Sequence, residues 1–117
     1  MILIKHPRNW GLEEEVVLKL ATGVLKNFGF REREVELSVC FVGRGRARKL
    51  NWQYRKMNYV PQVLVFPMSK RVDSDGLTHL GDVVICTQKL KYEAKFLKKN
   101  IGVVLTEWMT HGVGNLV

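Results

Sequence analysis

The most informative side chains of this chain lie near its last residues, where one histidine stands at a spacing that metal sites use. Two imidazoles four residues apart on a helix share one face and can grip a single metal ion. Here His111 is followed by Asn115 at that place, not by a second histidine. Because an amide oxygen is a poor substitute for an imidazole nitrogen on a borderline-soft ion, the spacing predicts weak metal binding at best.

Other side chains near His111 leave several interpretations open. Glu107 precedes His111 by four residues, so Glu107, His111 and Asn115 share one helical face. This trio could hold a metal weakly, Glu107 could orient the imidazole, or the residues could be ordinary helix-surface neighbours. His79 could add a ligand, but we expect a solvated histidine in a polar loop. Gly112 occupies the place of the glutamate in H-E-x-x-H proteases, which argues against a peptidase.

A dense group of cationic side chains is the second chemical feature of the sequence. Guanidinium groups bridge phosphate oxygens bidentately, so a helix that carries several of them suits an RNA backbone. The alternative is an ordinary solvated helix surface. The residues that we predict to bind RNA are Arg44, Arg46, Arg48, Lys49, Arg55 and Lys56.

Further lysines and the three tryptophans are weaker candidates for RNA contacts. A lysine-rich stretch over residues 88–100 is either a second basic face or a solvated outer surface. Tryptophans can stack on bases, although packing in or near the core is their more common role. These candidates are Lys89, Lys91, Lys95, Lys98, Lys99, Trp10, Trp52 and Trp108.

The charge balance of the 117 residues favours a polyanionic partner. Nineteen Lys and Arg against eleven Asp and Glu give a formal net charge of +8 at pH 7, and such a field attracts nucleic acid. No apolar run has the length needed to cross a bilayer, and residues 1–5 are too short for a signal peptide. We therefore expect a cytoplasmic protein in which Cys40 and Cys86 are unpaired, buried apolar side chains.

The elements that must position these side chains alternate between strands and helices. Apolar periodicity and turn residues predict strands over residues 1–5, 35–42, 63–66 and 82–86, helices over 12–28, 44–55, 88–100 and about 103–115, and a polar loop over 68–79. This order predicts a single small α/β (α+β) domain with a mixed sheet of about four strands covered by helices. The last two strands are expected to be antiparallel, because only a loop joins them.

Two local expectations accompany this assignment. On the helix over residues 44–55 we expect Ala47, Leu50 and Tyr54 to face inward. In the last helix, Gly112 and Gly114 each cost about 1 kcal/mol relative to alanine. That cost indicates either close packing at the glycines or a frayed helix end.

Four sequence blocks, in order and in register, resemble the YbeY family of metal-dependent endoribonucleases that mature ribosomal RNA. The first is ELSVCFV at 36–42, followed by Leu50-Asn51 and Tyr54-Arg55. VLVFP at 63–67 resembles the family's V-L-S-F-P, and LGDVVIC at 80–86 resembles its L-G-D-I-V-I-S. The last is His111-Gly112, the opening of H-G-x-L-H-L-x-G-Y-D-H.

The resemblance implies a YbeY-like domain, zinc as the cofactor, rRNA as the substrate and the small ribosomal subunit as a candidate partner. It implies that His111 is a zinc ligand and a catalytic residue. It also implies that Arg55, which matches the arginine of the family's Tyr-Arg pair, contacts RNA or serves catalysis.

The site positions depart from the family pattern, whereas the fold positions match it. Only the first of the family's three zinc histidines has a counterpart, because the second falls on Asn115 and the third lies beyond Val117. Gln62 stands where the family has an aspartate, and Val65 replaces the serine of V-L-S-F-P. We therefore expect a domain that lacks the family's C-terminal end, with impaired or lost catalysis.

Two functions remain open at this point, in addition to the case of a fragment whose missing end carries the other ligands. The first is a single-strand-specific endoribonuclease in rRNA processing, with His111 on zinc and Arg55 at the scissile phosphate, which requires stoichiometric metal. The second is a catalytically inactive basic module on the same fold, which binds RNA or the ribosome with a steep salt dependence. The sequence leaves the RNA site and the oligomeric state undetermined.

Overall fold

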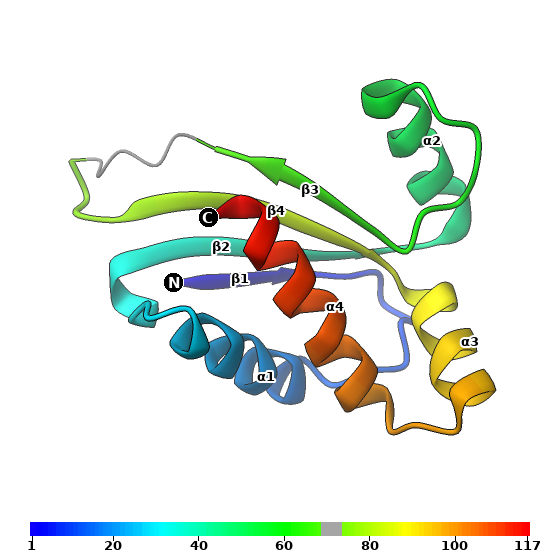
Figure 1. Ribbon diagram of the computed structural model, residues 1–117, viewed down its shortest axis with the longest axis horizontal. Helices are drawn as coiled ribbons and strands as arrows, with labels where there is room; N and C mark the ends of the chain where they lie inside the picture. Colours follow the sequence, from blue (N-terminus) through cyan, green and yellow to red (C-terminus); the bar gives the residue numbers. More distant parts are fainter. Residues whose placement is uncertain (69–73) are drawn as a thin grey trace.

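The fold is built on a four-stranded mixed sheet in the part of the chain that the computed structural model describes, residues 1–68 and 74–117. Its strands are β1 (Ile2–Lys5), β2 (Val35–Val42), β3 (Val63–Pro67) and β4 (Thr78–Cys86), in the order β1-β2-β4-β3 (Figure 1). β1, β2 and β4 are parallel, and β3 pairs with β4 in the antiparallel sense. The predicted sheet of about four strands and its antiparallel pair are confirmed. Residues 69–73 of the predicted loop lie outside the described residues.

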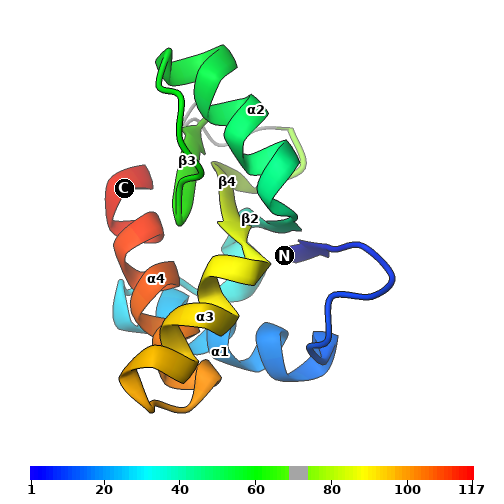
Figure 2. The same cartoon turned by 90° about the vertical axis from the view of Figure 1, so that its right-hand side faces the viewer.

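The helices divide unequally between the two faces of the sheet. They are α1 (Glu14–Asn27), α2 (Arg44–Arg55), α3 (Thr87–Leu97) and α4 (Ile101–Leu116), and a short 3-10 turn, η1, covers Glu32–Glu34. α1, α3 and α4 lie on one side of the sheet and α2 lies on the other (Figures 1 and 2). No helix in the described ranges has both the length and the apolar character needed to span a membrane.

The main core lies between the sheet and the three helices α1, α3 and α4. Alternate residues of β2 point into it, and Val35, Leu37, Val39 and Phe41 are all buried there, as the period of two predicts. Burial of this apolar surface is the main stabilising contribution to the fold. Cys40 is half-buried, Cys86 is buried, and both thiols are free.

A smaller apolar cluster lies under α2, and it corrects one expectation. Ala47 of α2 is buried against Leu64 and neighbouring strand residues. Tyr54, expected to face inward, is 66% exposed, and its ring makes a T-shaped contact with the ring of Phe66. The fully buried Asn51 takes the inward place, and its amide donates to the carbonyl of Tyr59 (3.1 Å). The amide therefore ties the end of α2 to the segment that leads into β3.

The break between α3 and α4 comes earlier than the sequence indicated. α3 ends at Leu97 and Lys98 adopts a left-handed conformation (φ 54°). Asn100 then caps α4, because its side chain accepts a hydrogen bond from the amide of Gly102 (2.8 Å). The spacing of Leu90, Ala94, Leu97 and Ile101 predicts that Ile101 continues the preceding helix, but it is the first residue of α4.

Two glycines of the family-like blocks stand at positions where a larger side chain would not fit. Gly81 has φ +128° at an irregularity in the β2–β4 ladder, and a side chain there would collide with the carbonyl oxygen of Phe66. Gly112 lies where α4 crosses β4, and a Cβ atom there would be 2.9 Å from a methyl group of Val83. Gly112 thus marks close packing, which fixes the neighbouring residue His111 beside the sheet, whereas a Cβ atom at Gly114 would make only an ordinary contact with Phe28.

Candidate functional site

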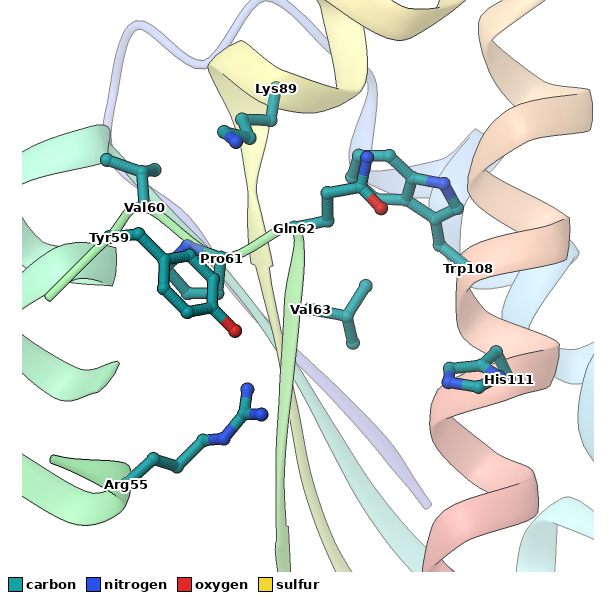
Figure 3. Close-up of a pocket in the computed structure, with 9 residues that line it drawn as sticks. All are labelled: Arg55, Tyr59, Val60, Pro61, Gln62, Val63, Lys89, Trp108 and His111. Atoms are coloured by element: carbon teal, nitrogen blue, oxygen red, sulfur yellow. The ribbon is translucent and has the colours of Figure 1, made fainter. Parts of the chain in front are cut away.

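A groove between α2 and α4 places Arg55 and His111 on opposite walls, with β3 at its floor (Figure 3). It consists of two cavities of about 470 and 520 Å³, both lined by Arg55, Val63 and His111. The residues that line only the first cavity are Tyr59, Val60, Pro61, Gln62, Lys89 and Trp108. The structure therefore brings together in one groove the two predicted catalytic residues, which lie on different helices and more than fifty positions apart in the sequence.

The groove is suited to an anion. The guanidinium of Arg55 and the hydroxyl of Tyr59 both point into the space between α2 and α4 (Figure 3). Lys89 adds a second cation, and no carboxylate is among the described residues that line either cavity. Positive charge in the lining of a concave site attracts anions such as phosphate groups.

His111 has a hydrogen-bond partner one turn further along α4. Its Nε2 atom lies 3.4 Å from the side-chain nitrogen of Asn115, a long hydrogen bond. Glu107, which shares their helical face, lies instead 3.5 Å from the ammonium of Lys99. His111 and Asn115 are thus brought together, and Glu107 is engaged elsewhere.

The residues around His111 do not fit a zinc site. A catalytic zinc takes three protein ligands and a structural zinc takes four, whereas the described chain offers one imidazole and one amide here. Within residues 1–68 and 74–117, the histidine, cysteine and carboxylate groups that converge closely enough to hold a metal are Glu36, Asp75 and His79. That group does not include His111.

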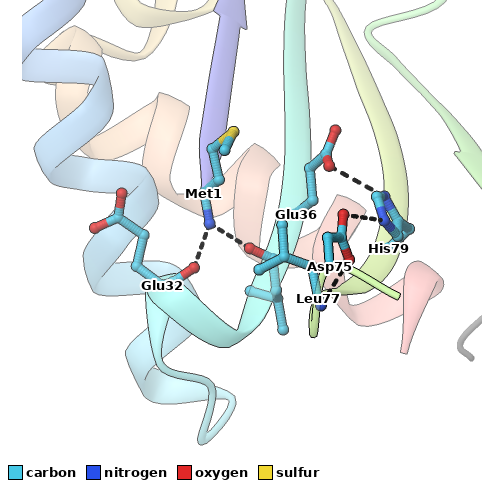
Figure 4. A network of polar contacts seen from close by, with 7 residues as sticks. Met1, Glu32, Glu36, Asp75, Leu77 and His79 are labelled. Carbon is cyan, nitrogen blue, oxygen red and sulfur yellow. Dashed lines mark hydrogen bonds and ion pairs between the residues drawn. The ribbon is translucent and has the colours of Figure 1, made fainter. Parts of the chain in front are cut away.

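His79 corrects an expectation of the sequence analysis. It was expected in a solvated loop, but β4 begins at Thr78 and pairs His79 with Glu36 of β2. The half-buried imidazole lies 3.1 Å from Glu36 through Nδ1 and 3.4 Å from Asp75 through Nε2 (Figure 4). Asp75 also accepts a hydrogen bond from the amide of Leu77 (2.9 Å). The donor atoms of the three residues lie within 4.8 Å of one another, which is close enough for a divalent cation.

Polar contacts near the start of β2 also hold the beginning of β1 in place. The amino group of Met1 donates to the carbonyl oxygens of Glu32 and Val35 (Figure 4). These contacts fasten β1 to the turn before β2, so the start of β2 that carries Glu36 is fixed on both sides.

The predicted RNA-binding cations surround α2, and Arg55 is the one among them that lines the groove. Arg46 lines a separate cavity beside Cys40 and Lys5. Arg48 donates to the side-chain oxygen of Asn58 (2.9 Å). The others are exposed around α2 and its C-terminal cap, namely Arg44, Lys49 and Lys56. The structure thus gives α2 a positive surface on several sides, not a single basic face.

The tryptophans differ in their availability for stacking on bases. Trp10 is buried against Phe41 and stacks on His6, with 3.9 Å between the ring centroids. Trp108 is buried, and its Nε1 donates to Glu93 (3.0 Å). Trp52 is 53% exposed, so it is the tryptophan that keeps a ring face open to solvent.

Tyr59 lines the groove but was absent from the predicted site, and Gln62, which also lines it, was named only as the replacement of the family's aspartate. Both flank the Val60-Pro61 step that leads into β3. Both residues lie shortly before VLVFP at 63–67, the block that resembles the family's V-L-S-F-P. Their closeness to that block was the sequence signal that could have found them.

The comparison of the whole chain with known proteins gives one family. The family model described as Endoribonuclease YbeY matches residues 7–116. Among curated proteins named Endoribonuclease YbeY, the one from Idiomarina loihiensis is 30% identical over 105 residues, which cover 90% of this chain and 64% of that protein. The Legionella pneumophila protein is 33% identical over 107 residues, covering 91% and 66%. The Mesoplasma florum protein is 29% identical over 100 residues, covering 75% and 59%.

The chain therefore spans 59% to 66% of the length of these three curated relatives. Among solved structures, the solution structure of TM1509 from Thermotoga maritima superposes with a TM-score of 0.66 and 20% sequence identity. The superposition covers 99% of this chain and 71% of that chain. At this identity the likeness shows a shared fold.

Proposed function

Because the chain belongs to the YbeY family of endoribonucleases, we propose that it acts on ribosomal RNA during maturation and binds the RNA in the groove between α2 and α4. The observation that carries the proposal is that Arg55 and His111 face each other across this groove. Arg55 supplies a phosphate-binding cation, and His111 supplies an imidazole, a group that can transfer protons.

Arg55 is the phosphate-binding residue of this proposal. Its guanidinium presents planar paired donors that match two phosphate oxygens. Lys89 adds a compact charge on the same cavity, and the Tyr59 hydroxyl points into it (Figure 3). Together these groups hold one phosphodiester of the strand in front of His111.

His111 is the proton-transfer residue. As the protonated imidazolium it can donate a proton to the leaving oxygen, and as the neutral imidazole it can accept a proton from the attacking group. Acting as a lone acid or base, such a group typically supplies about 10²–10⁴-fold in rate. Zinc is the cofactor that the family resemblance implies, but Asn115 stands at the second ligand position. We therefore propose that cleavage by this chain is weak.

The positive surface of α2 extends the contact with the RNA backbone. Arg44, Arg48 and Lys49 are exposed on the helix that ends at the groove-lining Arg55, and phosphate contacts position a strand without reading its sequence. We propose that the 117 residues form one YbeY-like domain, that it works in the cytoplasm where ribosomes mature, and that the small ribosomal subunit is a partner.

A catalytically inactive RNA-binding module is the second candidate function. The amide of Asn115 favours it, because this amide occupies the hydrogen-bonding atom Nε2 of His111 in place of a second imidazole. Both candidates use the same groove and differ in whether the bound strand is cut.

A binding and cleavage experiment with paired variants tests the proposal. Arg55→Gln should weaken binding of a short single-stranded RNA by about tenfold or more, because a charge-assisted phosphate contact is lost. Arg31→Gln, which removes an exposed arginine far from the groove, is the matched control and should bind like the unmodified protein. His111→Gln should keep binding and abolish any cleavage. Equal binding by the Arg55 and Arg31 variants would contradict the proposal.

A further inference from the structure

The outer surface of α3 carries two exposed aromatic rings among lysines, and we propose that it binds unpaired bases of an RNA strand that leaves the groove. We call Tyr92, Phe96 and the neighbouring Lys89, Lys95 and Lys98 the α3 ridge. The inference rests on the proposed function in taking RNA as the ligand of the groove, and it adds where the rest of the strand lies.

The two rings form a ready platform. Phe96 is 71% exposed, the highest value among the exposed large hydrophobic side chains of the described residues, and Tyr92 is 65% exposed. Their centroids lie 6.1 Å apart and their planes differ by 11°, so they form a parallel pair along the helix. A base stacked on an outer ring face would continue this pair. Base–aromatic stacking of this kind tolerates every base, because every base has a π face.

Lysines flank the rings on both sides. At 100° per residue, Lys89 projects on one side of the Tyr92–Phe96 row and Lys95 on the other. Lys98 follows at the C-terminal cap of the helix. A strand with its bases on the rings would therefore have its phosphates within reach of ammonium groups, which is the usual arrangement of single-strand binding sites.

Local acidic groups do not oppose such a ligand. Glu93 is the single carboxylate in the α3 sequence. It accepts hydrogen bonds from Gln62 (3.2 Å) and from Trp108 (3.0 Å). These contacts hold its charge on the groove side of the helix, away from the aromatic row.

The same charges argue for RNA over a protein partner. Exposed apolar surface of this kind marks an interaction site. A protein that covered the two rings would also have to desolvate the neighbouring ammonium groups and pair them. A polyanion pairs them by its own backbone, and the formal net charge of +8 favours its approach.

The ridge is continuous with the groove. Lys89 lines the cavity that holds Arg55 and His111, and Phe96 lies seven residues further along α3, about 10 Å by the helical rise. A strand bound at Arg55 can therefore pass Lys89 and reach the rings within a few nucleotides.

Fluorescence anisotropy with a labelled single-stranded RNA of twelve nucleotides tests the inference in the full chain. The double variant Tyr92→Ser/Phe96→Ser should weaken binding at least about fivefold, the lower limit for losing one stacked base. The matched control is Val16→Ser/Leu18→Ser, which removes two exposed apolar side chains of α1 and should bind normally. A duplex of the same sequence should not respond to the aromatic substitutions, because its bases are already stacked.

The contribution of the lysines is tested by the salt dependence of RNA binding. The variant Lys95→Gln/Lys98→Gln should lower the slope of log K against log salt by about 1.4, since each phosphate contact to a single strand contributes about 0.7. Lys19→Gln/Lys26→Gln on α1 removes the same charge elsewhere and should change the slope less. Equal slopes for the two pairs would contradict the lysine part of the ridge.

Failure of the ridge and failure of the proposed function give different results. If Tyr92→Ser/Phe96→Ser binds like its control, or if the duplex weakens as much as the single strand, the ridge is refuted and a protein partner becomes the occupant of α3. If the aromatic variant weakens binding whereas Arg55→Gln does not, the ridge stands and the groove assignment fails.

Discussion

His111 and Asn115 form a long hydrogen bond, with 3.4 Å between Nε2 and the amide nitrogen, along the face of α4 that lines the groove. The backbone geometry is that of a metal site with two histidine ligands on one helix, because residues four apart share one helical face. The side chain at the second position is what differs. The backbone of α4 would therefore allow a nitrogen ligand at position 115 to share a metal ion with His111, but the side chain there is an amide.

Replacing Asn115 by histidine should create the missing pair of imidazoles. We expect Asn115→His to bind zinc at least about tenfold more tightly than the unmodified chain, because a second nitrogen ligand joins the first. Competition with a chromogenic chelator would measure this affinity. The control His111→Gln/Asn115→His keeps one imidazole and should lose the gain. Equal affinity in both variants would show that the two positions do not share a metal.

The glycines of α4 should respond oppositely to alanine. A Cβ atom at Gly112 would lie 2.9 and 3.2 Å from the two methyl groups of the fully buried Val83, so Gly112→Ala should destabilise the fold by about 1–3 kcal/mol through overpacking. At the exposed Gly114 the nearest atom is Phe28 Cζ at 3.6 Å, an ordinary contact. Gly114→Ala should therefore gain up to about 1 kcal/mol of helix propensity. Urea unfolding of both variants measures the difference.

His6 should titrate above its ordinary pKa. Its Nδ1 lies 2.9 Å from the carbonyl oxygen of Pro7 and its Nε2 lies 3.1 Å from Glu14. The Pro7 carbonyl first, and then Glu14, raise the pKa of His6 above 6.5, and desolvation opposes them. The resulting stabilisation is complete below about pH 6.5, the unfolded value. It is lost as the pH rises through the higher pKa of the folded protein.

An NMR titration of the His6 ring protons would test this assignment. Glu14→Gln should lower the measured pKa without restoring the ordinary value, because the Pro7 contact remains. Glu15→Gln removes the adjacent exposed carboxylate and serves as the control. A larger shift for Glu15→Gln than for Glu14→Gln would disprove the pairing.

Cys40 should react slowly with alkylating reagents. Desolvation in the half-buried position, and then the charge of Asp82, raise the pKa of the Cys40 thiol, and the thiolate is the reactive form. Asp82→Asn should speed the alkylation of folded protein by iodoacetamide, measured by mass spectrometry at Cys40. A slower reaction in that variant would be inconsistent with the assigned cause.

Much of the fold followed from periodicity, and the misses have local causes. β2 and α2 were predicted over their observed ranges, because an uninterrupted alternation and a glycine boundary define them. Ile101 was assigned to the wrong helix because the apolar spacing of α3 continues across the break. Asn100, which caps α4, marks the helix start, but an assignment from apolar periodicity alone takes no account of capping residues.

The candidate site was predictable in its residues and not in its geometry. Arg55 and His111 came from motif resemblance, yet only the tertiary structure places them across one groove. His79 was taken for a loop residue because the turn-like composition before β4 concealed the start of that strand. Its meeting with Glu36 depends on strand register between β2 and β4, which no short-range pattern encodes.

The most direct test of the central claim is the zinc content of the purified protein, measured together with cleavage of a single-stranded RNA before and after chelation. The claim is that one imidazole and one amide cannot hold a catalytic metal, so that RNA binding outlasts cleavage. We predict well below one zinc per chain, RNA binding that chelation leaves unchanged, and weak or absent cutting. One tightly held zinc per chain, with cleavage that requires it, would contradict the account.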